Sequence, residues 1–216
     1  MPCRRSCWQV GIAAAILIAA SGCEPAGISH APAKIQSPSS PARDSTVRVT
    51  KQIELLNLEG AAVDPFVDAA DAPIVFLFMR TDCPIGNRYA PTIKELVEQF
   101  SSQGVTFYDV YADAVESVEM IRKHRKEYGY TEKALRDLEH VLVELTGVEV
   151  TPEAAVFVDH VMVYRGRIDN RFVDFGKTRT VTTTHDLHDV LQTVVAHQPV
   201  TTAWPKAVGC PIPALK

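Results

Sequence analysis

A run of six apolar residues at 74–79, Ile-Val-Phe-Leu-Phe-Met, constrains the fold of this chain more than any other feature. Pro73 precedes the run and a polar turn follows it, which is typical of a central strand buried on both faces. An amphipathic pattern begins a few residues later and places Ile93 and Phe100 on one face of a predicted helix. Cys83 is therefore expected where a buried strand ends and a helix begins.

This position favours a reactive thiol. Unpaired N–H groups and the positive end of a helix dipole stabilise a thiolate, and they lower the pKa of a cysteine from its free value of about 8.5. Arg80 and Arg88 flank Cys83 and are candidates to stabilise its thiolate or a bound anion, although an ordinary solvated role explains them equally well. Asn87 and Tyr89 are expected to hold the loop by hydrogen bonds, and Tyr89 would equally suit the core.

Strands and helices alternate along the rest of the chain. The expected elements are a strand at 105–111, helices at 115–128, 138–145 and 185–196, and a hairpin whose strands flank Asp159-His160. This order predicts an α/β domain with right-handed crossovers, whose site lies at the carboxyl ends of the strands, beside Cys83. His124 and His140 stand in charged helical surroundings, so we expect both on the surface.

The N-terminal region predicts export. Arg4 and Arg5 precede an apolar run at 10–20, which is shorter than the roughly 20 residues of a membrane-spanning helix but suits a signal peptide. Residues 1–22 are predicted to be a signal peptide of the lipoprotein type, because 20–23, Ala-Ser-Gly-Cys, resemble a bacterial lipobox. The alternative is an ordinary secretory signal. In the first case a lipid on Cys23 would tether the protein to a membrane of the bacterial cell envelope, on the periplasmic side.

Composition divides the remaining chain. Residues 23–46 are rich in proline, serine and alanine and predict a flexible tether, 47–197 have the length of a single domain, and 198–216 predict an extended tail. Cys3 and Cys7 fall in the removed segment, which leaves Cys83 in the domain and Cys210 in the tail. The formal net charge of −4 does not suggest a nucleic-acid partner.

Two proline motifs complete a family resemblance. A strand leading to Cys83-Pro84, followed by Thr151-Pro152 and a hairpin that ends in Tyr-Arg-Gly at 164–166, resembles the thioredoxin-like fold of the redoxin (alkyl hydroperoxide reductase/thiol-specific antioxidant) type. The resemblance implies a central mixed β-sheet flanked by helices, with Cys83 as the attacking cysteine and Pro152 as a cis-proline facing it. The backbone at Thr151 and Pro152 would then be the docking edge for substrate.

The chain also departs from the patterns of that fold. Gly86 stands where a thioredoxin dithiol carries its second cysteine, while Arg80 and Phe76 replace the threonine or serine and the proline of a typical peroxiredoxin. Motifs therefore assign neither standard activity, and Cys210 becomes the second decisive residue. If Cys210 acts on Cys83, the tail must fold back over the strand ends, and Trp204 is the expected anchor.

Three functions remain open. The first is a membrane-tethered thiol oxidoreductase without a cofactor or metal, in which Cys83 attacks a protein or small-molecule disulfide or a peroxide, Cys210 resolves the product, and an external thiol restores the enzyme. The second is a non-catalytic binding module with a structural Cys83–Cys210 disulfide. The third is copper handling like that of Sco-type chaperones, ranked last because Asn87 stands where that family has its second cysteine. His185 and His188 are better explained as an exposed polar helix start than as metal ligands.

Overall fold

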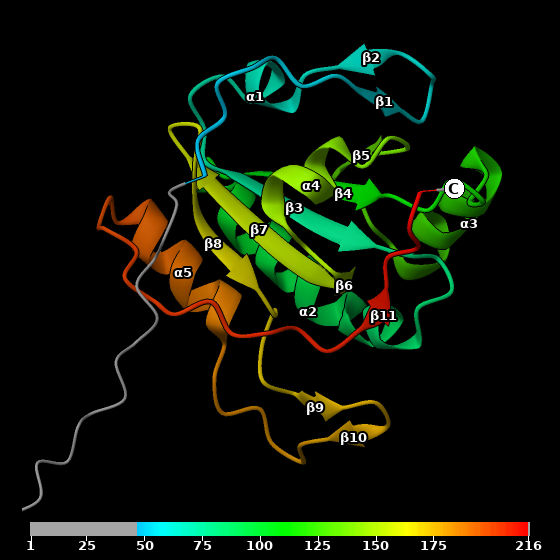
Figure 1. Cartoon of the computed structure of the whole chain (residues 1–216). Helices are drawn as coiled ribbons and strands as arrows, with labels where there is room; N and C mark the ends of the chain where they lie inside the picture. The colour runs from blue at the N-terminus through cyan, green and yellow to red at the C-terminus, as the bar shows by residue number, and fades with distance from the viewer. Residues whose placement is uncertain (1–46, 216) are drawn as a thin grey trace, which may run out of the picture. The chain divides into compact units, whose positions relative to one another are not determined.

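The computed structural model describes residues 47–215, which belong to one compact unit built on a mixed sheet (Figure 1). Its seven strands are ordered β2-β1-β5-β4-β3-β7-β8. In chain order they are β1 (Leu55–Asn57), β2 (Ala62–Val63), β3 (Ile74–Met79), β4 (Thr106–Tyr111), β5 (Lys133–Arg136), β7 (Glu153–Val158) and β8 (Val161–Gly166). Strands β3, β4 and β5 are parallel to one another, and β7 runs antiparallel to β3.

Two short strand pairs and five helices complete the fold. The small pairs are β6 (Val150–Thr151) with β11 (Cys210–Pro211), and β9 (Phe172–Asp174) with β10 (Lys177–Thr178). The helices are α1 (Pro65–Asp68), α2 (Pro84–Ser101), α3 (Val118–Tyr128), α4 (Val141–Thr146) and α5 (Asp186–Val195). None of the described helices is both long enough and apolar enough to cross a membrane.

Strand β3 forms the middle of the core, and all six of its residues are buried, as the apolar run predicts. Successive side chains of a strand point to opposite faces, so β3 contributes to two core layers. Val75 and Leu77 pack in the layer that contains α2, α3 and α5, whereas Phe76 and Phe78 pack in the layer that contains α1 and α4. The predicted fold class, a mixed sheet flanked by helices, is confirmed.

The structure contains elements that the sequence pattern did not predict. Residues 60–71 contain β2 and α1, and β5 lies between two predicted helices; the sequence pattern predicts no regular element in either segment. Strand β5, with the sequence Lys-Ala-Leu-Arg, has no apolar run and buries only Leu135 fully. It is a strand because β4 pairs with it on one side and β1 on the other, and such tertiary pairing overrides weak local propensity.

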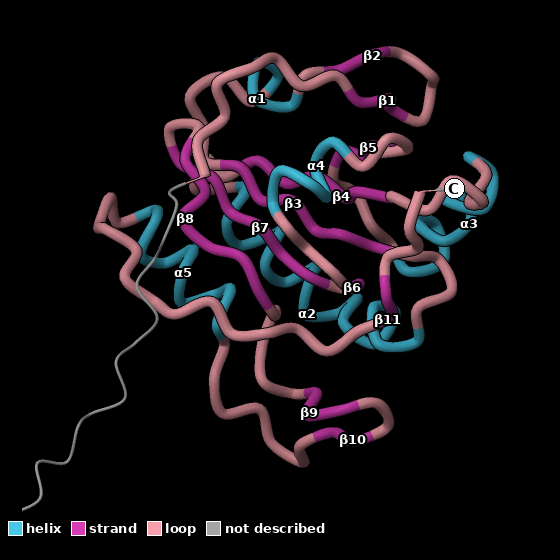
Figure 2. The backbone as a smooth tube through the Cα atoms, viewed as in Figure 1, coloured by secondary structure: helices cyan, strands magenta, loops and turns pink. Residues whose placement is uncertain are grey.

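The hairpin and the tail follow the sequence-based prediction. Asp159 and His160 form the β7–β8 turn with φ angles of 49° and 64°, so the turn takes the left-handed conformation without glycine. Beyond α5, the chain continues as a long loop past β8 before it forms β11 (Figure 2). The predicted signal peptide at 1–22, the tether at 23–46 and Cys23 lie outside the described residues.

Candidate active site

Cys83 is the N-cap residue of α2 and follows β3 after a short turn, where the sequence places it. Its side chain is fully buried, with 0% exposure. The Gly86 N–H donates a hydrogen bond to the Cys83 sulfur at 3.3 Å, and the thiol donates to the carbonyl oxygen of Thr151 at 3.0 Å. The sulfur therefore accepts a hydrogen bond from a helix-start N–H group, an interaction that would stabilise a thiolate.

The Thr151–Pro152 peptide bond is cis, as the family resemblance implies. A Cβ atom added to Gly86 would lie 3.7 Å from the Cys83 sulfur and 3.8 Å from Cδ of Pro152, so the proline ring packs against the first turn of α2. Thr151 and Pro152 are both buried. The backbone just before the proline thus lies directly beside the sulfur.

Cys210 reaches the same place from the tail. Strand β11 runs antiparallel to β6 with Cys210 opposite Thr151, and the Ile212 N–H extends the pairing to the carbonyl oxygen of Glu149 at 3.0 Å. Both thiols are free, and Cys210 is half-buried. Burial raises the pKa of Cys210 to about 12, a hydrogen bond with the Cys83 side chain adds to the rise, and the charge of Arg80 opposes it. The predicted return of the tail over the strand ends is therefore present.

The tail fits closely against the domain at two glycines. A Cβ atom at Gly209 would lie 2.2 Å from the carbonyl oxygen of Thr151, and one at Gly166 would lie 2.5 Å from the carbonyl oxygen of Pro205. No larger residue fits at either position unless the tail shifts. Trp204 anchors the loop as expected, because it packs against both core layers and donates a hydrogen bond to the carbonyl oxygen of Val163 at 3.2 Å.

Arg80 contacts the tail and two carboxylates. Its guanidinium lies 3.0 Å from Asp82 and 3.6 Å from Asp113, and it donates to the carbonyl oxygen of Pro211 at 3.3 Å. Among the described contacts it makes no hydrogen bond to Cys83. Asp113 was not predicted as a site residue. Its place two residues after β4 was a usable signal, because the carboxyl ends of parallel strands meet at one edge of a sheet.

A second carboxyl group fixes the loop before the cysteine. Glu116 is buried and accepts a hydrogen bond from the Thr81 N–H at 2.6 Å, and burial raises the pKa of this carboxyl group. The sequence alone does not reveal the role of Glu116, because a buried charged residue between a strand and a helix cannot be distinguished there from a solvated one. Together with Arg80, it positions the chain just before Cys83.

Asn87 connects this loop to a buried histidine, which corrects the prediction that His124 lies on the surface. The Asn87 side chain donates to the carbonyl oxygen of Thr81 at 3.2 Å, and its oxygen lies 2.8 Å from Nε2 of His124. The other ring nitrogen lies 3.0 Å from the Tyr111 hydroxyl, and burial lowers the pKa of His124 to about 4. The basic residues on either side of His124 made the whole segment 122–126 look solvent-exposed, although His124 points inward from α3.

His140 is also buried and not on the surface as expected. It takes a left-handed φ of 56° at the start of α4, and its Nε2–H donates to the carbonyl oxygen of Ala112 at 2.9 Å. This contact joins the start of α4 to the end of β4. Its role is local, and it does not approach the cysteines by any described hydrogen bond.

Tyr89 and Arg88 point to different surroundings. The Tyr89 hydroxyl donates to the carboxylate of Asp169 at 2.6 Å, its ring packs against Phe172, and the guanidinium of Arg171 lies 5.1 Å from the ring centre. Both expected roles of Tyr89, a hydrogen bond and core packing, are thus present. Arg88 is exposed, and its carbonyl oxygen accepts a hydrogen bond from Arg171 at 3.3 Å.

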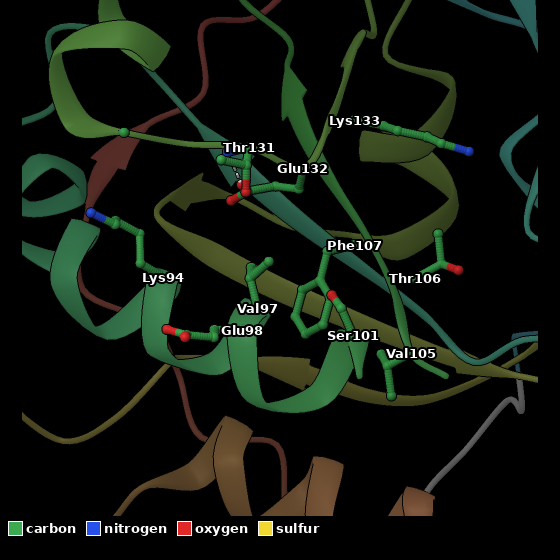
Figure 3. A pocket seen from close by; sticks show the side chains of 11 residues that line it. Lys94, Val97, Glu98, Ser101, Val105, Thr106, Phe107, Thr131, Glu132 and Lys133 are labelled. Carbon is green, nitrogen blue, oxygen red and sulfur yellow. Dashed lines mark hydrogen bonds between the residues drawn. The ribbon is translucent and has the colours of Figure 1, made fainter. Parts of the chain in front are cut away.

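A groove lies at the other end of the sheet. It has a volume of about 630 Å³ and is lined by the later turns of α2, the start of β4 and the segment leading into β5 (Figure 3). The side chains that line it include Lys94, Glu98, Phe107 and Glu132. Neither cysteine contributes to it. Within residues 47–215, no three histidine, cysteine or acidic side chains are grouped as metal ligands would be.

Comparisons with known proteins agree with this geometry. The profile of the AhpC/TSA family matches residues 48–195. A crystal structure of an uncharacterized conserved protein from Geobacillus kaustophilus superposes with a TM-score of 0.70 at 21% identity, covering 79% of this chain and 93% of that one. A hypothetical protein from Sinorhizobium meliloti 1021 gives a TM-score of 0.68 at 19% identity, over 78% and 94% of the two chains.

A neighbour with a named activity is more distant. The thioredoxin domain of a thiol-disulfide oxidoreductase from Bacteroides vulgatus gives a TM-score of 0.52 at 17% identity, covering 70% of this chain and 98% of that one. No curated protein matches the chain at a significant level. At these identities the solved structures support the thioredoxin-like fold.

Proposed function

Because the chain belongs to the AhpC/TSA family, we propose that it is a redoxin-type thiol-disulfide oxidoreductase in which Cys83 attacks and Cys210 resolves. One observation carries the proposal. Thr151 accepts a hydrogen bond from the Cys83 thiol and lies opposite Cys210 in the β6–β11 pair, so two cysteines from distant parts of the sequence meet at one residue. A meeting of this kind, at a helix start, fits an exchanging pair of thiols.

The reaction takes two exchange steps. The Cys83 thiolate attacks one sulfur of a substrate disulfide, forms a mixed disulfide and releases the other substrate sulfur as a thiolate, which takes up a proton. Cys210, after losing its proton, attacks the Cys83 sulfur, so that the Cys83–Cys210 disulfide forms and the second substrate thiol leaves. Two electrons have then passed from the protein to the substrate, and an external thiol donor reduces the disulfide again.

A disulfide suits the surroundings of Cys83 better than a peroxide does. Polarising an O–O bond needs hydrogen-bond donors beside the attacking sulfur. Among the described residues, the Cys83 sulfur has the Gly86 N–H, the carbonyl oxygen of Thr151 and the Cys210 thiol as hydrogen-bond partners. The Arg80 guanidinium is engaged with carboxylates and with the tail, so its charge acts on Cys210.

Single cysteine variants test the proposal. The full chain, purified in detergent, should reduce a disulfide-linked fluorescent peptide, and Cys83→Ser should lower the rate by about a hundredfold or more. Cys210→Ser should accumulate a mixed disulfide between Cys83 and the peptide, which mass spectrometry detects. Thr201→Ala, in an exposed part of the tail, is the matched control and should leave the rate unchanged. Equal rates for Cys83→Ser and the unmodified protein would rule out the oxidoreductase and favour the alternative, a non-catalytic binding module.

The proposal includes a location. We place the domain on the periplasmic side of the bacterial cell envelope, held by a lipid on Cys23, because the sequence at 1–23 has the order of a lipoprotein signal. Thiol-disulfide exchange suits an exported protein, since disulfides persist there. The substrates would then be disulfides of that compartment.

A further inference from the structure

The chain's own tail occupies a strand edge beside the attacking cysteine. The pairing of β11 with β6 involves only two residues on each side, and the Ile212 N–H adds one bond to Glu149. Figure 1 shows β11 as the last element of a tail that otherwise has no regular structure. A pairing this short is held by few hydrogen bonds and is suited to reversible release.

Access to Cys83 requires that release. The Cys83 side chain has 0% exposure, its sulfur is hydrogen-bonded to Thr151, and Cys210 lies against it from the tail. When the tail leaves, the main-chain groups of β6 lose their partners. A small peroxide cannot replace these partners, whereas an extended polypeptide can.

The tail also shows what such a polypeptide must look like. Cys210 is the residue opposite Thr151, and the residue before it, Gly209, has no room for a side chain because its Cβ would lie 2.2 Å from the Thr151 oxygen. Gly209 does not have the left-handed φ that favours glycine, so close approach alone explains the residue. A partner strand in the same register needs glycine at that place.

We propose that residues 209–212 are a built-in competitor for the docking edge at β6, and that the polypeptide which replaces the tail there carries an extended Gly-Cys segment in the same register. The use of the partner's cysteine rests on the function proposed above, while the strand pairing does not. The resting protein is closed, and the tail and a partner strand exclude each other.

The first test measures access to Cys83. In a Cys210→Ser background, Gly209→Ala should push the tail from β6 and raise the rate of Cys83 alkylation by iodoacetamide about tenfold or more. Trp204→Ala, which removes the anchor without touching β6, should act in the same direction and guards against a folding defect specific to Gly209→Ala. Thr201→Ala is the matched control, because this residue lies in the same tail and its side chain is exposed. Unchanged alkylation in both tail variants would overturn the closed arrangement.

The second test measures pairing without chemistry. A fluorescent peptide copies residues 204–213 with serine in place of the cysteine, and a second peptide has alanine in place of the glycine as well. With Cys83→Ser in every protein, anisotropy should show the glycine peptide binding the Gly209→Ala and Trp204→Ala chains about tenfold more tightly than a chain with the unmodified tail. The alanine peptide should not bind.

The outcomes separate the two proposals. Equal binding of the glycine and alanine peptides, or no binding to either tail variant, would overturn the strand-pairing site whatever the enzymatic activity. Selective binding together with full activity of Cys83→Ser would sink the proposed function and leave the pairing site standing. Circular dichroism of each variant confirms that the domain is folded.

Discussion

At the scale of single residues, His124 is the most informative. Its Nε2 faces the Asn87 oxygen, which only accepts hydrogen bonds, so that nitrogen donates, and in a neutral ring Nδ1 accepts from the Tyr111 hydroxyl. Burial lowers the pKa of His124 from 6.5 to about 4, which agrees with the neutral form. The buried neutral ring thus joins α3 to Asn87, which holds the loop before Cys83, and to Tyr111 of β4.

A pH-dependent stability follows. Because the folded pKa of His124 lies below its unfolded value, the stabilisation is complete above about pH 6.5 and is lost as the pH falls through about 4. The stability difference between the unmodified protein and His124→Gln should shrink by about 2–3 kcal/mol between pH 7.5 and pH 4.5. Urea unfolding at the two pH values measures it. His197→Gln, at an exposed position, should show no such change, and a parallel shift in both variants would contradict the assignment.

Residue-scale prediction from the sequence worked where a local motif carried the information. Cys83 at a strand–helix junction was predicted from the pattern of its own neighbours, and the cis bond before Pro152 was implied by the family resemblance that two short proline motifs carry. His124 and Glu116 were not, since their burial depends on elements far apart in the chain. When the neighbouring residues are charged, the sequence gives little sign that one side chain among them is buried.

At the scale of elements, α4 depends on one carboxyl group. Asp137 is fully buried and accepts three backbone hydrogen bonds, from the N–H groups of Val141, Leu142 and Val143, at 2.7–2.9 Å. These are first-turn donors that have no partner within the helix. We expect Asp137→Ala to destabilise the fold by about 2 kcal/mol or more, because it leaves buried N–H groups without an acceptor.

The matched variant is Asp137→Asn, which keeps one acceptor oxygen and should lose less stability than Asp137→Ala. Urea unfolding at pH 7 gives both values. Equal and negligible losses would mean that water replaces the carboxylate at the start of α4.

Helices and strands with a clear hydrophobic pattern of their own were predicted correctly, whereas those without one were not. β3, α2 and α5 have strong apolar periodicity, and the structure places all three as expected. The helix expected at 138–145 begins later, at Val141: its N-cap residue is His140, and Asp137, the residue after β5, accepts hydrogen bonds from its first N–H groups. Strand β11 could be inferred only as a returning tail, since two residues with a proline carry no strand signal and the pairing with β6 is long-range.

At the scale of the whole molecule, the sequence predicted the thioredoxin-like architecture from the order of elements and from two proline motifs. The AhpC/TSA match and the mixed sheet confirm it. The placement of Cys210 beside Cys83 was a prediction from chain length and composition, and the structure brings the two residues together. Their roles in a reaction remain predictions.

The proposed membrane attachment concerns the whole chain and has its own test. In bacteria that express the protein, radiolabelled palmitate should be incorporated into the unmodified chain and not into Cys23→Ser. Fractionation should move Cys23→Ser away from the membranes, because in the proposal this one residue carries the anchor. Cys3→Ser, a cysteine within the predicted signal segment, is the control and should be labelled normally. Label in Cys23→Ser would refute lipidation at this position.

The complete burial of Cys83 affects how readily its sulfur can be oxidised irreversibly. Irreversible oxidation of a cysteine to the sulfinic or sulfonic state needs a further oxidant molecule to reach a sulfur that has already reacted once. With the tail seated, that sulfur is fully covered, and the thiol beside it belongs to Cys210. A sulfenate formed by accident would therefore meet a neighbouring thiol before it met more oxidant. The same closure that slows productive encounters would let the protein persist undamaged in an oxidising environment.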